Sequence, residues 1–215
     1  MIEQLSVQPL IGEAILYKAL SVAFAYPEGD TLASLNDATF AENLRDALAR
    51  LPHANGLGES LARFTQALTH AQLDFGFAEE YTYLFMWGKS VPPYESSYTN
   101  RTPAGNQELA DVSGFYRAFG FDIANDAQEM PDHISAELEF LAMLCAKEAY
   151  ALEHAWQEQA EVCRAARREF LAEHLNRWLP AFAERIHAKA RAPFYPALAE
   201  FTRELAQTSE SALAV

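Results

Sequence analysis

The apolar residues of this chain follow the α-helical period almost throughout, and this pattern limits the fold more than any other feature. Near the N-terminus Ile11, Ile15 and Val22 recur at helical spacing until Pro27 ends the pattern. Runs of strand-type alternation, and the Asn-Gly or Asp-Gly turns that would join them, are absent from the sequence. The sequence therefore predicts an all-α protein.

The predicted helices suit one domain covering residues 1–215. They are expected at about 11–26, 37–50, 57–72, 75–87, 106–119, from 132 onward, 155–178, 181–190 and from 193 onward, with Pro180 as a break. We expect a single-domain helical bundle of about eight to ten helices. Two loops, 88–105 and 120–131, interrupt the predicted helices, and a hinge between two helical halves around residues 100–130 is one interpretation. Because a short hinge allows two copies to exchange halves, we expect either a monomer or a domain-swapped dimer.

Charge and length exclude several classes of function. Thirty acidic and 16 basic residues give a net charge of -14, which disfavours nucleic acid and suits a basic peptide as partner, although it also simply keeps a protein soluble. The N-terminal stretch lacks the basic start of a signal peptide, and no run of apolar residues is long enough for a membrane span. We expect a cytoplasmic protein.

Catalytic motifs are missing. The sequence holds no phosphate-binding glycine loop and no G-x-S-x-G elbow. A di-metal bundle needs two Glu-x-x-His pairs, and only Glu184 and His187 form one. An acid–base pair of His133 with Glu137 is imaginable but lacks a nucleophile. We expect no enzymatic activity, no metal and no cofactor. A metal-binding helical-bundle enzyme and a non-catalytic oligomerisation module are the alternatives.

Aromatic residues gather around the stiff stretch "MWGKSVPPYESSY". Tyrosine and tryptophan on a rigid support often anchor bound peptides, because little side-chain entropy is lost on contact. Alternatively, Pro92 and Pro93 only stiffen a connection and the tyrosines cover the core. The sequence leaves both interpretations open for these aromatics: Tyr81, Tyr83, Phe85, Trp87, Tyr94 and Tyr98.

A second notable stretch is "EMPDHISAELEFL", at the start of the long helix predicted from about residue 132. Asp132 is predicted to be its N-cap or a first-turn carboxylate, which the helix dipole favours. In that structural interpretation His133 is a first-turn residue, and Glu137 and Glu139 form a solvated face.

Taken together, the two stretches resemble the aromatic-x-x-Leu-Phe…Pro-Pro-x-x-Ser-x-Tyr and Glu-Pro-x-Asp-His elements of the TorD/DmsD/NarJ family. The later "FLAEHLNRWLPAF" and "PFYPALAEF" are similar to the C-terminal helices of that family. Its members are all-helical cytoplasmic chaperones of molybdenum enzymes. They bind the twin-arginine leader of a catalytic subunit, delay export and assist cofactor insertion.

The resemblance implies a twin-arginine leader as partner, and molybdenum-cofactor biosynthesis proteins as further partners. Glu95, which lies inside the first stretch, adds a carboxylate suited to a leader arginine. The other residues implied in leader binding are Tyr81, Leu84, Phe85, Pro93, Tyr94, Ser96, Tyr98, Glu129, Asp132 and His133.

Overall fold

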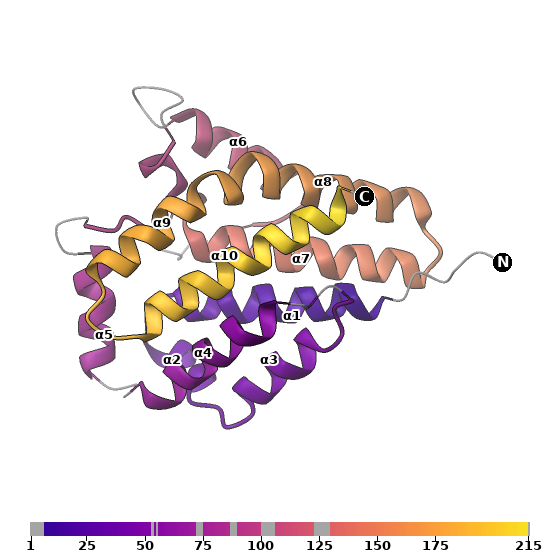
Figure 1. Ribbon diagram of the computed structural model, residues 1–215. Helices are drawn as coiled ribbons and strands as arrows, with labels where there is room; N and C mark the ends of the chain where they lie inside the picture. The colour runs from indigo at the N-terminus through magenta and orange to yellow at the C-terminus, as the bar shows by residue number, and fades with distance from the viewer. Residues whose placement is uncertain are drawn as a thin grey trace.

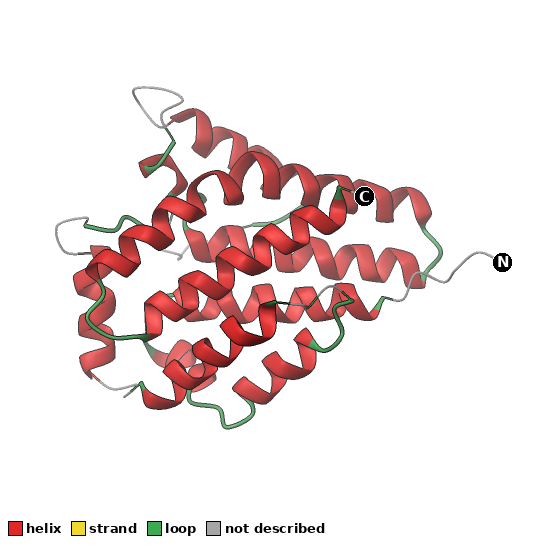
Figure 2. Cartoon of the chain, viewed as in Figure 1, coloured by secondary structure: helices red, strands yellow, loops and turns green. Residues whose placement is uncertain are grey.

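The computed structural model describes residues 7–52, 54, 56–71, 75–86, 90–99, 106–122 and 130–214. Within this part of the chain every regular element is a helix, which confirms the all-α prediction (Figure 2). The α-helices are α1 (Gln8–Phe24), α2 (Gly29–Leu35), α3 (Phe40–Leu48), α4 (Leu57–His70), α5 (Phe75–Tyr81), α6 (Asn106–Ala118), α7 (Ile134–Glu153), α8 (Gln157–Phe170), α9 (Asn176–Lys189) and α10 (Phe194–Leu213). Two wide π-turns, Thr82–Met86 and Leu171–Leu175, and one 3-10 turn, Glu95–Ser97, complete them.

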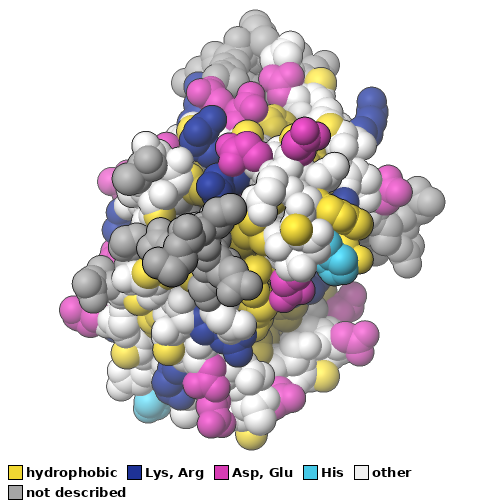
Figure 3. Space-filling view, turned by 90° about the vertical axis from the view of Figure 1, so that its right-hand side faces the viewer, with side chains coloured by type: hydrophobic (Ala, Val, Ile, Leu, Met, Phe, Trp, Pro, Cys, Tyr) yellow, Lys and Arg dark blue, Asp and Glu magenta, His cyan; other side chains and the backbone are white. Residues whose placement is uncertain are grey.

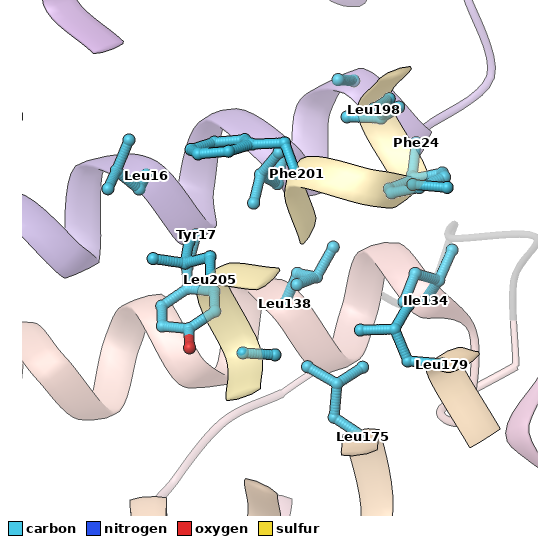
Figure 4. Packing of buried hydrophobic residues seen from close by; sticks show 14 of the residues in the cluster. Leu16, Tyr17, Phe24, Ile134, Leu138, Leu175, Leu179, Leu198, Phe201 and Leu205 are labelled. Carbon is cyan, nitrogen blue, oxygen red and sulfur yellow. The ribbon is translucent and has the colours of Figure 1, made fainter. Parts of the chain in front are cut away.

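Helix α7 lies at the centre of the bundle, packed between α1 and α8, while α10 crosses in front of both α1 and α7 (Figure 1). In the core, Leu16 and Tyr17 of α1 meet Leu138 of α7 and the apolar side of α10, which includes Phe201 (Figure 4). All four side chains are fully buried. The same hydrophobic cluster takes residues from α1 through α10.

A buried ionic network ties the two ends of the chain together. Arg167 of α8 binds Glu148 of α7 at 2.6 Å and also pairs with Glu13 of α1. Ser209 of α10 donates to Glu13 at 2.9 Å. Burial of a guanidinium is tolerated here because carboxylates partner it on two sides. Figure 3 faces the end of the molecule where α1 begins and shows hydrophobic side chains between acidic and basic ones.

The break predicted at Pro180 is wrong, because Pro180 lies inside α9. A proline ring normally clashes with the carbonyl four residues earlier, which here is that of Asn176. The π-turn directly before Asn176 widens the backbone, and the amide of Asn176 bonds to Leu171, five residues back. Wide turns of this kind are a common way for a helix to accommodate a distortion. The short helix α2 was not among the predicted helices.

Helices α1, α3, α4 and α6 begin and end within a few residues of their predicted limits, and α10 begins one residue after its predicted start. No helix of the described part is long and apolar enough to cross a membrane.

Candidate functional site

The two stretches singled out in the sequence meet in space. Tyr94 and His133 form an isolated antiparallel bridge. The amide of Ile134 donates to the carbonyl of Pro93 at 2.9 Å, and the amide of Glu95 donates to the carbonyl of Asp132 at 3.0 Å. We call this contact between residues 93–96 and 130–135 the loop joint. It fixes an irregular loop against the first turn of α7.

Side chains complete the loop joint. Asp132 accepts a hydrogen bond from the amide of Ser96 at 3.1 Å, and so binds the 3-10 turn that follows Tyr94. The N-cap of α7 is His133, whose Nδ1 accepts from the amide of Ser135 at 3.2 Å. The predicted N-cap role of Asp132 is therefore wrong by one residue, because the helix begins at Ile134 and the Asp132 side chain turns to the loop instead.

A cluster of buried carboxylates lies beneath the joint. Glu95, Asp132 and Glu137 are all at most 1% exposed. Glu95 pairs with His174 at 3.0 Å, and Glu137 accepts from the indole of Trp178 at 3.2 Å. The prediction that Glu137 faces solvent is wrong, because its side chain points between α7 and α9.

The pKa of the Glu137 carboxyl is strongly perturbed. Burial raises its pKa well above the ordinary value, and the neighbouring Glu95 and Asp132 raise it further, while the Trp178 hydrogen bond acts in the opposite direction. Burial together with Glu137, Asp132 and Glu95 likewise raises the pKa of Tyr116, whose hydroxyl donates to the carbonyl of Pro131 at 2.8 Å.

Both π-turns of the described chain adjoin the loop that carries the joint. The carbonyl of Leu84, in the first π-turn, accepts from the amide of Val91 at 3.2 Å. His174, in the second, reaches Glu95 from the opposite side. Wide turns are rare in helices and are frequent at functional sites, so their position marks this loop as more than a connection.

The aromatic residues singled out in the sequence belong largely to the core. Tyr81 and Phe85 are 2% and 6% exposed and pack against Tyr195 of α10, with ring centroids 6.2 and 5.2 Å away. Leu84 and Pro93 are also buried. The side chains of this predicted set that stay half-buried are those of Tyr94, Ser96 and Tyr98.

Tyr98 illustrates the boundary between core and surface. Its ring lies 5.4 Å from that of Trp178, and the guanidinium of Arg185 stands 4.5 Å above the ring on the other side. Partial burial raises the pKa of the hydroxyl to about 12, against the lowering effect of Arg185. Trp87 and Glu129, both named from the sequence, lie outside the described residues.

Sequence reasoning missed two kinds of residue. The first kind comprises the buried side chains packed beside the loop joint, namely Glu137, Trp178 and His174. No local signal in the sequence points to His174 or Trp178, because their partners are far away in the chain. Met86 and Met130, in the first and second stretch respectively, are 57% and 47% exposed. Both methionines lie inside the quoted motifs, so the sequence showed that they are present but not that they are exposed.

The fold and the loop joint together define the class: an all-helical protein whose irregular loop is fixed against the first turn of α7. Within the described residues, no group of three or more side chains that could hold a metal forms. Comparison with known proteins places the chain within that class. The family model described as nitrate reductase delta subunit matches residues 51–184, which include the whole loop joint.

Two curated relatives are assembly chaperones. The selenate reductase assembly chaperone of Thauera selenatis is 39% identical over 62% of this chain and 68% of its own length. The chlorate reductase assembly chaperone of Ideonella dechloratans is 32% identical over 80% of this chain and 75% of its own length. The chain therefore belongs to the nitrate reductase delta subunit family, the TorD/DmsD/NarJ group of chaperones. The prediction that it is not an enzyme is confirmed by these relatives, which are named chaperones.

A solved structure supports the fold separately. A redox enzyme maturation protein from Archaeoglobus fulgidus superposes with a TM-score of 0.56 over 89% of this chain and 91% of its own, at 23% identity. At this identity the similarity shows the fold alone.

Proposed function

We propose that this protein is a cytoplasmic assembly chaperone that binds the twin-arginine leader of a molybdenum oxidoreductase subunit. It holds back export of the subunit and assists cofactor insertion and assembly. The observation that carries the proposal is the loop joint, which joins the two stretches that resemble the leader-binding elements of the family. The named reductase chaperones among the relatives agree with such a client.

Burial divides the proposed site residues into two roles. Glu95, Asp132 and His133 are inaccessible in this structure and act by holding the loop against α7. Contact with the leader then falls to the half-buried Tyr94 and Tyr98 and to the side chains beside the joint. Tyrosine anchors already restrained by packing lose little entropy on binding.

The exposed methionines suit the apolar segment that follows the two arginines of a leader. Met86 and Met130 are flexible, polarisable side chains that adapt to different apolar partners. The net charge of -14 attracts the arginines from a distance and raises the rate of encounter. Most of the affinity then comes from burial of apolar surface.

The test is a fluorescence anisotropy titration with a labelled twin-arginine leader peptide. Changing both Met86 and Met130 to serine should weaken binding by about ten-fold or more, because each removes about 1 kcal/mol of apolar contact. Val162→Ser is the matched control, since Val162 is as exposed as Met86, at 57%, but lies on α8. A peptide with Ala-Ala in place of Arg-Arg measures the charge contribution. Equal weakening by the methionine variant and the control would remove the support for this site.

A further inference from the structure

Helix α7 has an outward face that no helix among the described residues covers completely. Along it Ala142, Met143, Ala146 and Tyr150 recur at helical spacing, one stripe about two turns long. Ala146 and Tyr150 are exposed, Tyr150 by 53%. In Figure 1, α7 runs between α1 and α8, so these two helices border the stripe on either side.

A groove lies along each border. The α1 groove, between α7 and the helices α1 and α3, has a volume of about 780 Å³ and is lined by apolar side chains such as Ile15 and Phe40. The α8 groove, between α7 and α8, has a volume of about 770 Å³. Met143 and Ala146 line both grooves. The grooves therefore form one continuous surface with the α7 stripe as its floor, which we call the α7 surface.

Large exposed hydrophobic side chains concentrate in the α8 groove. Tyr150, Trp156 and Val162 are 53%, 49% and 57% exposed, and they are three of the six such side chains in the described chain. The rings of Tyr150 and Trp156 contact each other at 5.7 Å. Exposed apolar groups scattered singly need no explanation, whereas a contiguous set marks an interaction site.

The turn that presents Trp156 is rigid. Its amide donates to the carbonyl of Ala151 at 2.8 Å, and Ala155 before it takes a positive φ of 58°. Glycine usually occupies this left-handed position after a helix, because a Cβ is disfavoured there. The backbone of the turn thus places Trp156 beside Tyr150, and an exposed aromatic pair of this kind is suited to act as an anchor.

The charges on the α7 surface select the partner. Its two lysines are engaged inside the chain: Lys18 pairs with Glu139, and Lys147 donates to the carbonyl of Phe119 at 2.6 Å. One further carboxylate lies in each groove, Asp37 in the α1 groove and Glu158 in the α8 groove. Hydrogen bonds from Thr39 lower the pKa of Asp37, so that it is charged at neutral pH. Counted together, the three carboxylates Glu139, Asp37 and Glu158 outnumber the two lysines, so the surface has a net negative charge and a positively charged occupant is complementary to it.

We propose that the α7 surface binds an amphipathic helix of a partner protein, with an apolar stripe bordered by lysine or arginine. A helix of about three turns, roughly 16 Å long, covers the floor from Glu139 to Tyr150. A second copy of this chain would bring its own charge of -14 to the same surface, and an anionic membrane would also be repelled. The α7 surface shares no residue with the loop joint, so it is a binding site in addition to the proposed leader site.

The test uses a designed helical peptide of about four turns as the probe, with one leucine face and lysines along its borders. Binding is measured by anisotropy on the full chain. Ala146→Lys places a long cationic side chain at the centre of the floor. Because Ala146 is exposed within α7 and lysine is a good helix former, the variant should fold normally. We expect it to weaken binding by about ten-fold or more, while Ala146→Ser has little effect.

Two further measurements separate the alternatives. A peptide of the same design with glutamates in place of lysines should bind several-fold more weakly than the lysine peptide, and added salt should narrow the difference. Equal affinity of wild type and Ala146→Lys for the lysine peptide would overturn the proposal. So would a mass that doubles with concentration in the wild type but not in Ala146→Lys, which would assign the surface to a second copy. The leader peptide should bind Ala146→Lys as it binds wild type, so failure of one proposal is distinguishable from failure of the other.

Discussion

Replacing Asp132 and His133 together by alanine should lower the stability of the fold, and the structure sets the size of the effect. The Asp132 change leaves the amide of Ser96 without its acceptor in a partly buried position, which costs about 1–3 kcal/mol. The His133 change removes the N-cap of α7, which costs about 0.5–2 kcal/mol. Because the two side chains support one joint, the effects need not add, and we expect about 2–4 kcal/mol in total.

A loss of that size is a large share of a domain's free energy of unfolding, which is typically about 5–15 kcal/mol. It is measured by urea unfolding at pH 7, followed by far-ultraviolet circular dichroism. Asp132→Asn and His133→Asn are the matched controls, since each retains an acceptor where the alanine variant has none. Ser97→Ala, on the exposed side of the same loop, should change stability by less than about 0.5 kcal/mol.

The reasoning would be refuted by a double alanine variant as stable as wild type. In that case the joint contributes no net free energy to the fold, and the two residues are available for another role. If the double alanine variant is less stable but its folded fraction binds the leader as tightly as wild type does, the result agrees with a structural role for Asp132 and His133.

Two further predictions concern the interior. Burial raises the pKa of Glu137 in the folded chain above 4.5, so the unfolded chain releases this proton at a lower pH than the folded chain does. The free energy of unfolding therefore falls as the pH rises from 4.5 through the folded-state pKa. Glu137→Gln removes this dependence, so its stability relative to wild type should increase between pH 4.5 and pH 8 in urea titrations; a constant difference would contradict the assigned cause. Gly12→Ala should destabilise by about 1–3 kcal/mol, because its Cβ would lie 2.6 Å from the carbonyl oxygen of Ala47. Gly114→Ala, with nothing within 4 Å, should instead stabilise α6 by about 0.5–1 kcal/mol, and thermal melts of the pair test both signs.

The sequence predicted the helices well because their signals are local. Apolar spacing and the flanking prolines and glycines placed α1, α4 and α10 nearly as the structure has them. Pro180 shows where a local rule fails: a proline normally ends a regular helix, but here it lies inside α9, which directly follows a wide turn. That turn contains His174, whose partner Glu95 is far away in the chain, so the sequence near Pro180 does not reveal the contact.

The sequence singled out the residues that form the loop joint but did not predict which of them are exposed. Both stretches stood out in the sequence, and Tyr94 and His133 pair between them. Periodicity alone could not show that Glu137 faces inward, because a glutamate in the first turn of a helix is normally solvated. Its burial depends on Trp178, which approaches from α9 and supplies the hydrogen bond. Such pairing between distant segments determines burial and leaves no trace in local sequence.

The chemistry of the buried cluster explains why polar residues occupy a place that leucine could fill. Apolar side chains would pack in the same volume, and replacing buried polar groups in this way is often neutral or stabilising. They would not, however, fix an irregular loop in one register. The bonds from Asp132 to Ser96 and from Glu95 to His174 are directional, and each joins the loop to a different helical segment. The position of Tyr94, and with it the surface proposed for the leader, is therefore set by contacts that the leader itself need not touch.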